Sequence, residues 1–220
     1  MPSSKKVFTL LATLAASTFL SHAAWGFTLV SPPTVRGYPG NEVIFDYNPT
    51  DCGISEADLT SIIDQSVLLW SGVPTSRLKV SRGASVTTTY AEYLTNRNAA
   101  SSGTFRGNPV IICDTAFEAH FGSSSSTVGV GGSTNDLDDQ FEATLAYGAI
   151  ILNLQSGATA NYATAISVTG RLQTMAHEMG HVLGLGHSGE PEAIMSYSHI
   201  GSEFNLGQDD VNGITYLYPR

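Results

Sequence analysis

The residues best suited to do chemistry lie in one segment, from His177 to His187, which reads HEMGHVLGLGH. Two histidines four positions apart share one face of a helix, where both imidazole rings can reach one small cation. Gly184 can adopt the left-handed backbone that ends a helix, so the chain can turn and bring a third histidine back to the ion. The segment therefore predicts a metal site made of His177, His181 and His187.

A general base accompanies these ligands. Zinc held by three protein nitrogens keeps a fourth position open for water, and Glu178, directly after the first histidine, is placed to take the proton of that water. Two solvated histidines are the alternative explanation of a bare H-E-x-x-H. Here the longer pattern H-E-x-x-H-x-x-G-x-x-H is complete, and Met195 follows its last histidine by eight residues. The segment therefore predicts a zinc hydrolase rather than two surface histidines.

The combination resembles the signature of the metzincin metalloproteases. Ser188 after the third histidine, the step to Met195 and the run LGQDDVNGI at 206–214 are most similar to the matrixin branch. This resemblance implies an α+β, metzincin-type zincin fold. Such a fold has a twisted, mostly parallel sheet with long helices in an upper subdomain and a small C-terminal subdomain that ends in a helix. It also implies one catalytic Zn²⁺ and a polypeptide substrate.

Two residues after the histidines acquire roles by the same resemblance. Met195 would form the Met-turn, a hydrophobic floor beneath the metal, and would not be a ligand. Tyr197 departs from the Met-Tyr-Pro run typical of matrixins and follows the Met-x-Tyr pattern of serralysins and astacins. In those families the tyrosine can reach the metal or the oxyanion. A catalytic role for Tyr197, as a fifth ligand or a transition-state donor, and the absence of one both stay open.

Hydrophobic periodicity indicates the elements that position the site. A strand at 43–47 is followed by a helix that Ser55 caps and Gly72 ends, with an apolar stripe at helical spacing. A short strand is expected at 78–80 and a buried one at 149–154, before a long helix that begins near Thr169 and carries the first two histidines. Asp209 and Asp210 open a last helix, where they favour the positive end of its dipole, and we expect their role to be structural.

The middle of the chain is less regular. Short strands are expected at 86–90 and 110–113, while 91–108 fits either a helix with a loop or an insertion. The glycine-rich run at 128–132 lacks the Lys-Ser/Thr ending of a phosphate loop. By resemblance it lies near the sheet edge that receives the backbone of the substrate, and strand addition there would give broad specificity.

The N-terminus has the layout of a secretory signal peptide. Lys5 and Lys6 precede an apolar run, and small residues offer cleavage after Ala23 or Gly26. A membrane anchor is the alternative, but the run is shorter than the roughly 20 residues that a spanning helix needs. We therefore expect residues 1–26 to be removed and 27–220 to form a single catalytic domain. It would be secreted, or periplasmic in a bacterium, with no membrane attachment.

Composition restricts the partners. The formal net charge of the chain is −9, and loss of Lys5 and Lys6 leaves 8 basic against 19 acidic residues, a net charge of −11. A surface this negative repels nucleic acid and anionic membranes, so neither is expected to bind. We expect a monomer. The acidic cluster Asp136, Asp138 and Asp139 suggests a Ca²⁺ site by comparison with matrixin loops, although a solvated acidic loop is the more frequent explanation of such a cluster.

The remaining histidines and the two cysteines bear on a second zinc site and on a disulfide. Beyond the predicted signal and the three ligands, only His120 and His199 remain, too few for the second, three-histidine zinc site that is usual in matrixins. In an exported chain, an even cysteine count predicts a disulfide between Cys52 and Cys113. The alternative is that Cys52 occupies the open position of the zinc as a latency switch. Cys52 directly precedes an expected helix, which favours the disulfide.

Two other functions fit the same sequence. The chain could be an adhesin or scaffold that binds zinc without turnover, although the presence of Glu178 favours catalysis. It could also be a secreted zinc amidase of non-protein substrates, since the same chemistry attacks any amide. The expected function is zinc-dependent endopeptidase activity.

Overall fold

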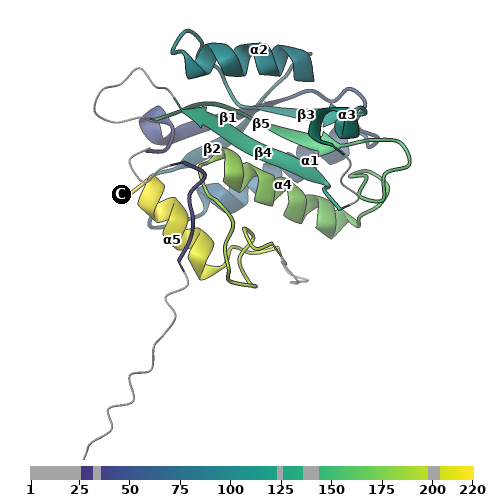
Figure 1. Cartoon of the computed structure of the whole chain (residues 1–220). Helices are drawn as coiled ribbons and strands as arrows, with labels where there is room; N and C mark the ends of the chain where they lie inside the picture. Colours follow the sequence, from purple (N-terminus) through teal and green to yellow (C-terminus); the bar gives the residue numbers. More distant parts are fainter. Residues whose placement is uncertain (1–25, 32–35, 123–125, 136–143, 198–203) are drawn as a thin grey trace, which may run out of the picture.

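A five-stranded sheet with helices on both faces forms the centre of the molecule (Figure 1). The computed structural model describes residues 26–31, 36–122, 126–135, 144–197 and 204–220. Four strands run parallel, and the fifth pairs antiparallel at one edge. In spatial order they are β2 (Lys79–Ser85), β1 (Glu42–Tyr47), β3 (Val110–Asp114), β5 (Leu145–Asn153) and β4 (Gly129–Asn135). The mostly parallel α+β architecture expected from the sequence is confirmed.

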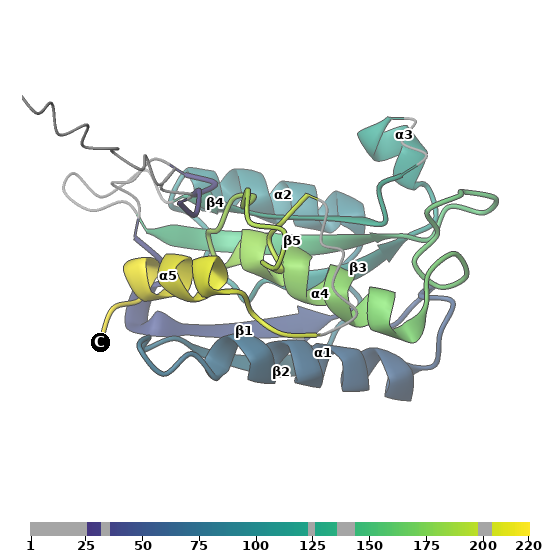
Figure 2. The same ribbon diagram turned by 90° about the horizontal axis from the view of Figure 1, so that it is seen from below.

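Helices α1 (Glu56–Ser71) and α4 (Val168–Val182) cover one face of the sheet, and α2 (Tyr90–Ser101) covers the other (Figure 1). In the view from below, α1 and α4 lie side by side in front of the strands (Figure 2). The indole N–H of Trp70 on α1 donates to the carbonyl of Ala176 on α4 at 3.0 Å. This buried contact fixes the helix that carries the first two histidines against its neighbour.

The two central strands are buried at every position. Because helices cover both faces of β3 and β5, both strands are mostly apolar, and each ends in a buried polar residue, Asp114 or Asn153. The larger apolar cluster lies between the sheet and α1, α4 and α5 (Gln208–Leu217), and the smaller lies under α2. The strands expected at 43–47 and 110–113 are present, and the one expected at 149–154 is found as β5, which begins at Leu145 and ends at Asn153.

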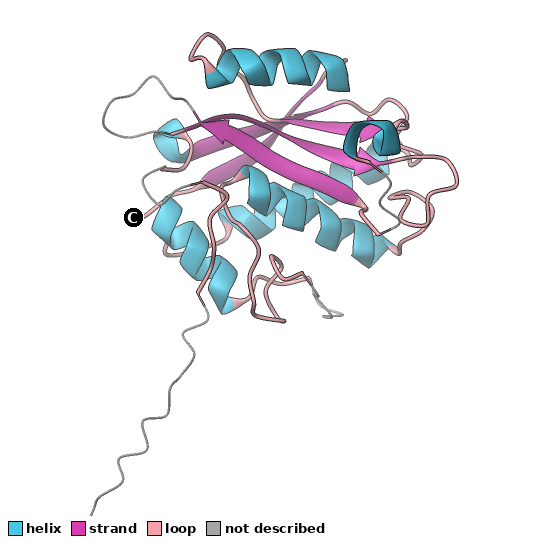
Figure 3. Cartoon of the chain, viewed as in Figure 1, coloured by secondary structure: helices cyan, strands magenta, loops and turns pink. Residues whose placement is uncertain are grey.

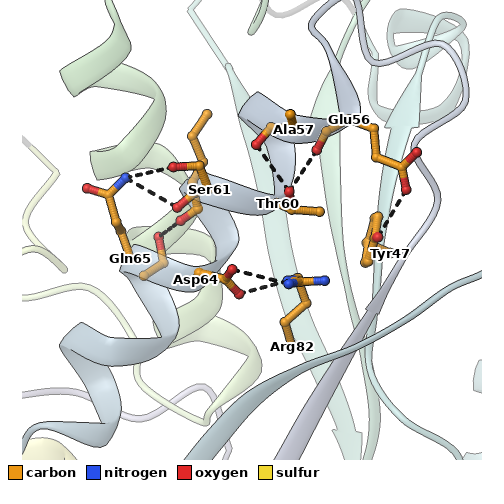
Figure 4. Close-up of polar contacts among 10 residues, drawn as sticks. Tyr47, Glu56, Ala57, Thr60, Ser61, Asp64, Gln65 and Arg82 are labelled. Atoms are coloured by element: carbon orange, nitrogen blue, oxygen red, sulfur yellow. Dashed lines mark hydrogen bonds and ion pairs between the residues drawn. The ribbon is translucent and has the colours of Figure 1, made fainter.

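Local capping sets the start of α1 as expected. The Ser55 hydroxyl accepts from the Asp58 N–H at 3.1 Å, and the helix ends at Ser71, before Gly72. On its outer side, the guanidinium of Arg82 on β2 pairs with Asp64 at 2.7 Å, and Tyr47 donates to Glu56 at 3.0 Å (Figure 4). These contacts join α1 to the sheet and lie outside the candidate site.

The strand expected at 86–90 is wrong. Residues 86–89 are not in a strand, and α2 begins at Tyr90. The cause is a capping box, in which Thr89 accepts from the Glu92 N–H at 3.3 Å and the Glu92 carboxylate accepts from the Thr89 N–H at 2.8 Å. For 91–108 the helix-and-loop alternative holds, since α2 continues to Ser101.

Between α4 and α5 the described chain consists of loops, drawn pink in Figure 3. This part and α5 form the small C-terminal portion, as the sequence indicated. The remaining helices are α3 (Phe117–Phe121) and a 3-10 turn, η1 (Pro39–Asn41).

A disulfide joins Cys52 and Cys113, whose Cα atoms are 5.0 Å apart. It connects the segment before α1 to β3, and both residues are buried. The disulfide, and not the latency switch, is therefore the arrangement found.

Some expectations fall outside the described residues. The signal peptide, except its last residue Gly26, lies there, as do the acidic cluster at 136–139 and His199. His120 is described, and its Nδ1 lies 2.6 Å from a carboxylate oxygen of Asp114. Within the described part of the chain, every helix is too short or too polar to cross a membrane.

Candidate metal centre

Three imidazole rings converge at the C-terminal end of α4. Ligand nitrogens of His177, His181 and His187 all lie within 4.8 Å of one another. His177 and His181 stand one turn apart on the helix, and Nε2 of His187 lies 3.3 Å from Nε2 of His181. The structure thus brings together the three residues that the spacing singled out, in an arrangement that suits a small cation.

The end of α4 explains how the third histidine returns. Gly184 has a φ of 109°, in the left-handed region. A Cβ at this position would lie 3.0 Å from Leu217 and 3.2 Å from Leu145, so a side chain would meet both strain and crowding. Glycine therefore turns the chain here, as expected, and delivers His187.

Two of the rings are oriented by backbone carbonyls. Nδ1 of His177 lies 2.7 Å from the carbonyl oxygen of Ile194, and Nδ1 of His181 lies 2.8 Å from that of Leu185. A proton on Nδ1 then donates to the carbonyl and leaves the Nε2 lone pair for a metal. Burial lowers the pKa of His181 to about 4, and neighbouring His177 adds to this effect. The ring is therefore neutral near pH 7, the state that binds zinc.

The first described residues contact the loop that carries the third histidine, His187. The Thr28 carbonyl accepts from the Gly186 N–H at 2.8 Å, and the Thr28 hydroxyl donates to the carbonyl of His187 at 2.7 Å. Leu29 and Leu185 form an isolated antiparallel bridge. Sequence reasoning missed Thr28, because a single threonine 159 positions from its partner has no pattern to reveal it.

Met195 lies beneath the histidine helix. The residue is 2% exposed, and a Cβ on Gly180 would overlap its sulfur. The buried carboxylate of Asp210 accepts from the N–H groups of Ile194 at 2.7 Å, Met195 at 3.1 Å and Gly207 at 2.8 Å. Asp210 thus fixes both the turn and the start of α5, a structural role that the sequence indicated only in general terms.

A cleft of about 720 Å³ opens beside the histidines, between β4 and α4. Glu178 lines it although the residue is only 7% exposed. Burial raises the pKa of the Glu178 carboxyl to about 7, and a hydrogen bond from the backbone N–H of Gly131 opposes this shift. Gly131 belongs to β4, so the edge strand contacts the expected general base directly.

Tyr197 stands at the other side of the site. Its ring stacks on that of His187, with centroids 3.7 Å apart and planes inclined by 27°, and 82% of the residue is exposed. The structure therefore places Tyr197 next to one of the three candidate metal-binding histidines.

Comparison with known proteins agrees with this geometry. Residues 118–219 match the family model described as Matrixin. Interstitial collagenase B of Mus musculus is 53% identical over 45 residues, which are 20% of this chain and 10% of the relative. Matrilysin of Homo sapiens is 47% identical over 53 residues, 22% of this chain and 20% of the relative. Macrophage metalloelastase of Oryctolagus cuniculus is 51% identical over 45 residues, 19% and 10% respectively.

The fold and the three-histidine site resemble those of the metzincins, and residues 118–219 are similar to the matrixin branch of that class. The aligned stretches span only about a tenth to a fifth of the length of these relatives.

Proposed function

We propose that the protein is a secreted zinc-dependent endopeptidase. The observation that carries the proposal is the convergence of three imidazole nitrogens beside a buried carboxylate, at the wall of an open cleft. The donor set fits zinc, since three histidine nitrogens with an open position are a known catalytic zinc arrangement. His177, His181 and His187 would hold the ion. When bound, zinc supplies Lewis acidity that lowers the pKa of water and polarises a carbonyl.

The remaining chemistry belongs to Glu178. Its carboxylate would take the proton from the attacking water and pass it to the leaving amine. A group that both accepts and donates a proton works best with a pKa near the working pH, and burial moves the pKa of Glu178 in that direction. The Gly131 N–H holds the carboxylate at the cleft wall.

The substrate would be an extended polypeptide. β4 is the last strand on its side of the sheet and lines the cleft at Gly129, Val130 and Gly131. An extended peptide can add to such an edge through backbone hydrogen bonds, which carry little side-chain preference. Broad cleavage specificity follows from this mode of binding.

The test is hydrolysis of casein and of a quenched peptide library by purified protein of measured zinc content. Glu178→Gln should lower turnover about 100- to 10,000-fold with the zinc content unchanged. A chelator should abolish turnover, and added zinc should restore it. Zinc-loaded, folded protein that cleaves nothing would support the scaffold alternative, and cleavage of only non-peptide amides would support the amidase.

Secretion, a monomeric state and calcium binding are further parts of the proposal. The signal sequence supports export, and N-terminal sequencing of the exported protein should begin at Ala24 or Phe27. Light scattering should give the mass of one chain. Replacing Asp136, Asp138 and Asp139 by asparagine should remove any calcium-dependent rise in melting temperature, and no such rise in the parent protein would contradict a calcium site.

A further inference from the structure

We infer that Tyr197 is a positioning residue that holds the ring of His187 by stacking, and not a zinc ligand. The inference rests on the proposed zinc site and assigns to Tyr197 a role different from the one in serralysins and astacins. Its basis is an asymmetry among the three histidines.

His177 and His181 each have a carbonyl partner at Nδ1, 2.7 Å and 2.8 Å away. Within the described part of the chain, no hydrogen-bonding group contacts Nδ1 of His187. Metal-binding histidines almost always have a second contact that fixes the orientation of the ring. Among the described residues, the third histidine therefore has no hydrogen bond like those that orient the other two.

The ring of Tyr197 gives His187 a contact of another kind, over the face of the imidazole. It is nearly parallel to the imidazole of His187, with centroids 3.7 Å apart. Stacking of this kind restricts the tilt of the imidazole about its side-chain bonds and covers one face of it from solvent. His181 and His177 meet His187 from other directions, with centroids 4.6 Å and 5.2 Å away.

The backbone delivers Tyr197 to this place. Ser188 and Ser196 form an isolated parallel bridge, and the Ser188 N–H donates to the carbonyl of Met195 at 2.8 Å. The residues next to this bridge are His187 and Tyr197. His187 directly precedes Ser188, and Tyr197 directly follows Ser196, so this bridge holds the backbones of the two stacked residues near each other.

The exposure of Tyr197 argues against a role in the core. With 82% of the residue exposed, its side chain contributes little burial to the folding free energy. Its removal should therefore act on the third ligand and leave the fold intact, which makes the inference testable without loss of structure.

The experiment measures the rate at which zinc leaves the protein to an excess of chelator, for the parent protein, Tyr197→Phe, Tyr197→Ala and the control Leu68→Ala. Leu68 is also exposed, at 70%, and lies on α1. Tyr197→Ala should release zinc about tenfold faster. Tyr197→Phe should stay within about twofold of the parent, because it keeps the ring that stacks. The control should match the parent, and all four zinc-free proteins should melt at similar temperatures.

Three other results would each contradict a different part of the inference: that Tyr197 is not a ligand, that it positions His187, or that the protein binds zinc. If Tyr197→Phe releases zinc as fast as Tyr197→Ala, the hydroxyl is what matters and Tyr197 is a ligand. If Tyr197→Ala equals the parent, stacking does not position His187. If the parent protein holds no zinc at all, the proposed function fails, and this result is separate from the other two.

Discussion

The backbone N–H of Gly131 donates to the carboxylate of Glu178, and the backbones of the two residues are in close contact. A Cβ on Gly131 would overlap the Glu178 carbonyl oxygen and lie 2.8 Å from its carbonyl carbon. The strand that we propose receives the substrate is therefore pressed directly against the proposed base. A residue with a side chain cannot occupy position 131 unless β4 or α4 moves.

Gly131→Ala should therefore lower kcat/KM about 10- to 100-fold, because a displacement of about 1 Å is enough to misalign a catalytic group. Gly132→Ala is the matched control. It lies next along the same strand, and a Cβ there would meet nothing within 4 Å. Its kcat/KM should stay within about twofold of the parent. Equal activities for both variants, at equal zinc content, would contradict a positioning role for Gly131.

The raised pKa of Glu178 gives a pH dependence of stability in the zinc-free protein. The folded-state pKa is about 7, above the ordinary value of 4.5. The stabilisation is therefore complete below pH 4.5 and is lost as the pH rises through 7. Glu178→Gln lacks this loss. With chelator present, the variant should gain about 3 kcal/mol over the parent between pH 4 and pH 8.

Urea unfolding at both pH values measures the difference. Other titrating groups are common to the two proteins, so the comparison isolates Glu178. The contribution of His181 to stability, for example, depends on pH in the opposite direction. Its pKa is lowered to about 4, so its stabilisation is present above the ordinary value of 6.5 and is lost as the pH falls through 4. A difference between variant and parent that does not change with pH would contradict a raised pKa of Glu178.

The sequence was most informative where the determinants are local. Histidines at i and i+4 on one helix, and a glycine that ends it, are encoded within eleven residues. For that reason His177, His181 and His187 could be chosen in advance, and α1 and α4 could be placed to within a residue or two. The disulfide was also predictable, because two cysteines allow only one pairing.

Long-range contacts were not predictable. Thr28 on the His187 loop, Gly131 on Glu178 and Asp210 under Met195 are each ordinary residues in their own local sequence. Their roles come from hydrogen bonds to groups that are far away in the sequence. The false strand at 86–90 has a local cause, since Thr89 reads as a β-former but acts as a helix cap. Propensity alone does not distinguish these two uses of threonine.

Asp210 should be important to stability although it lies outside the metal cluster. Asp210→Asn replaces one of the two acceptor oxygens by an NH2 group, which donates and cannot accept from the backbone N–H groups that the carboxylate now satisfies. Because the site is buried, we expect a loss of about 2 to 4 kcal/mol in the free energy of unfolding, measured by urea denaturation. Burial raises the pKa of Asp210, and its three backbone hydrogen bonds oppose that shift.

Asp64→Asn is the matched control for this change. Asp64 pairs with Arg82 on the surface, as Figure 4 shows, and is about half exposed. A surface ion pair is worth at most about 1 kcal/mol, so the control should lose no more than that. Similar losses for the two variants would show that the turn does not depend on the Asp210 carboxylate.

The disulfide should stabilise the fold through the length of the loop that it closes. Cys52 and Cys113 are 61 positions apart, and the chain-entropy model gives about 4 kcal/mol for such a loop. The double variant Cys52→Ser, Cys113→Ser should therefore melt about 10 °C or more below the parent, with the zinc content unchanged in buffer at 20 °C. The parent protein with its thiols reduced should behave like the double variant, and under oxidising conditions it should contain no titratable thiol. A reactive thiol released by chelator would instead connect a cysteine to the metal and contradict the disulfide.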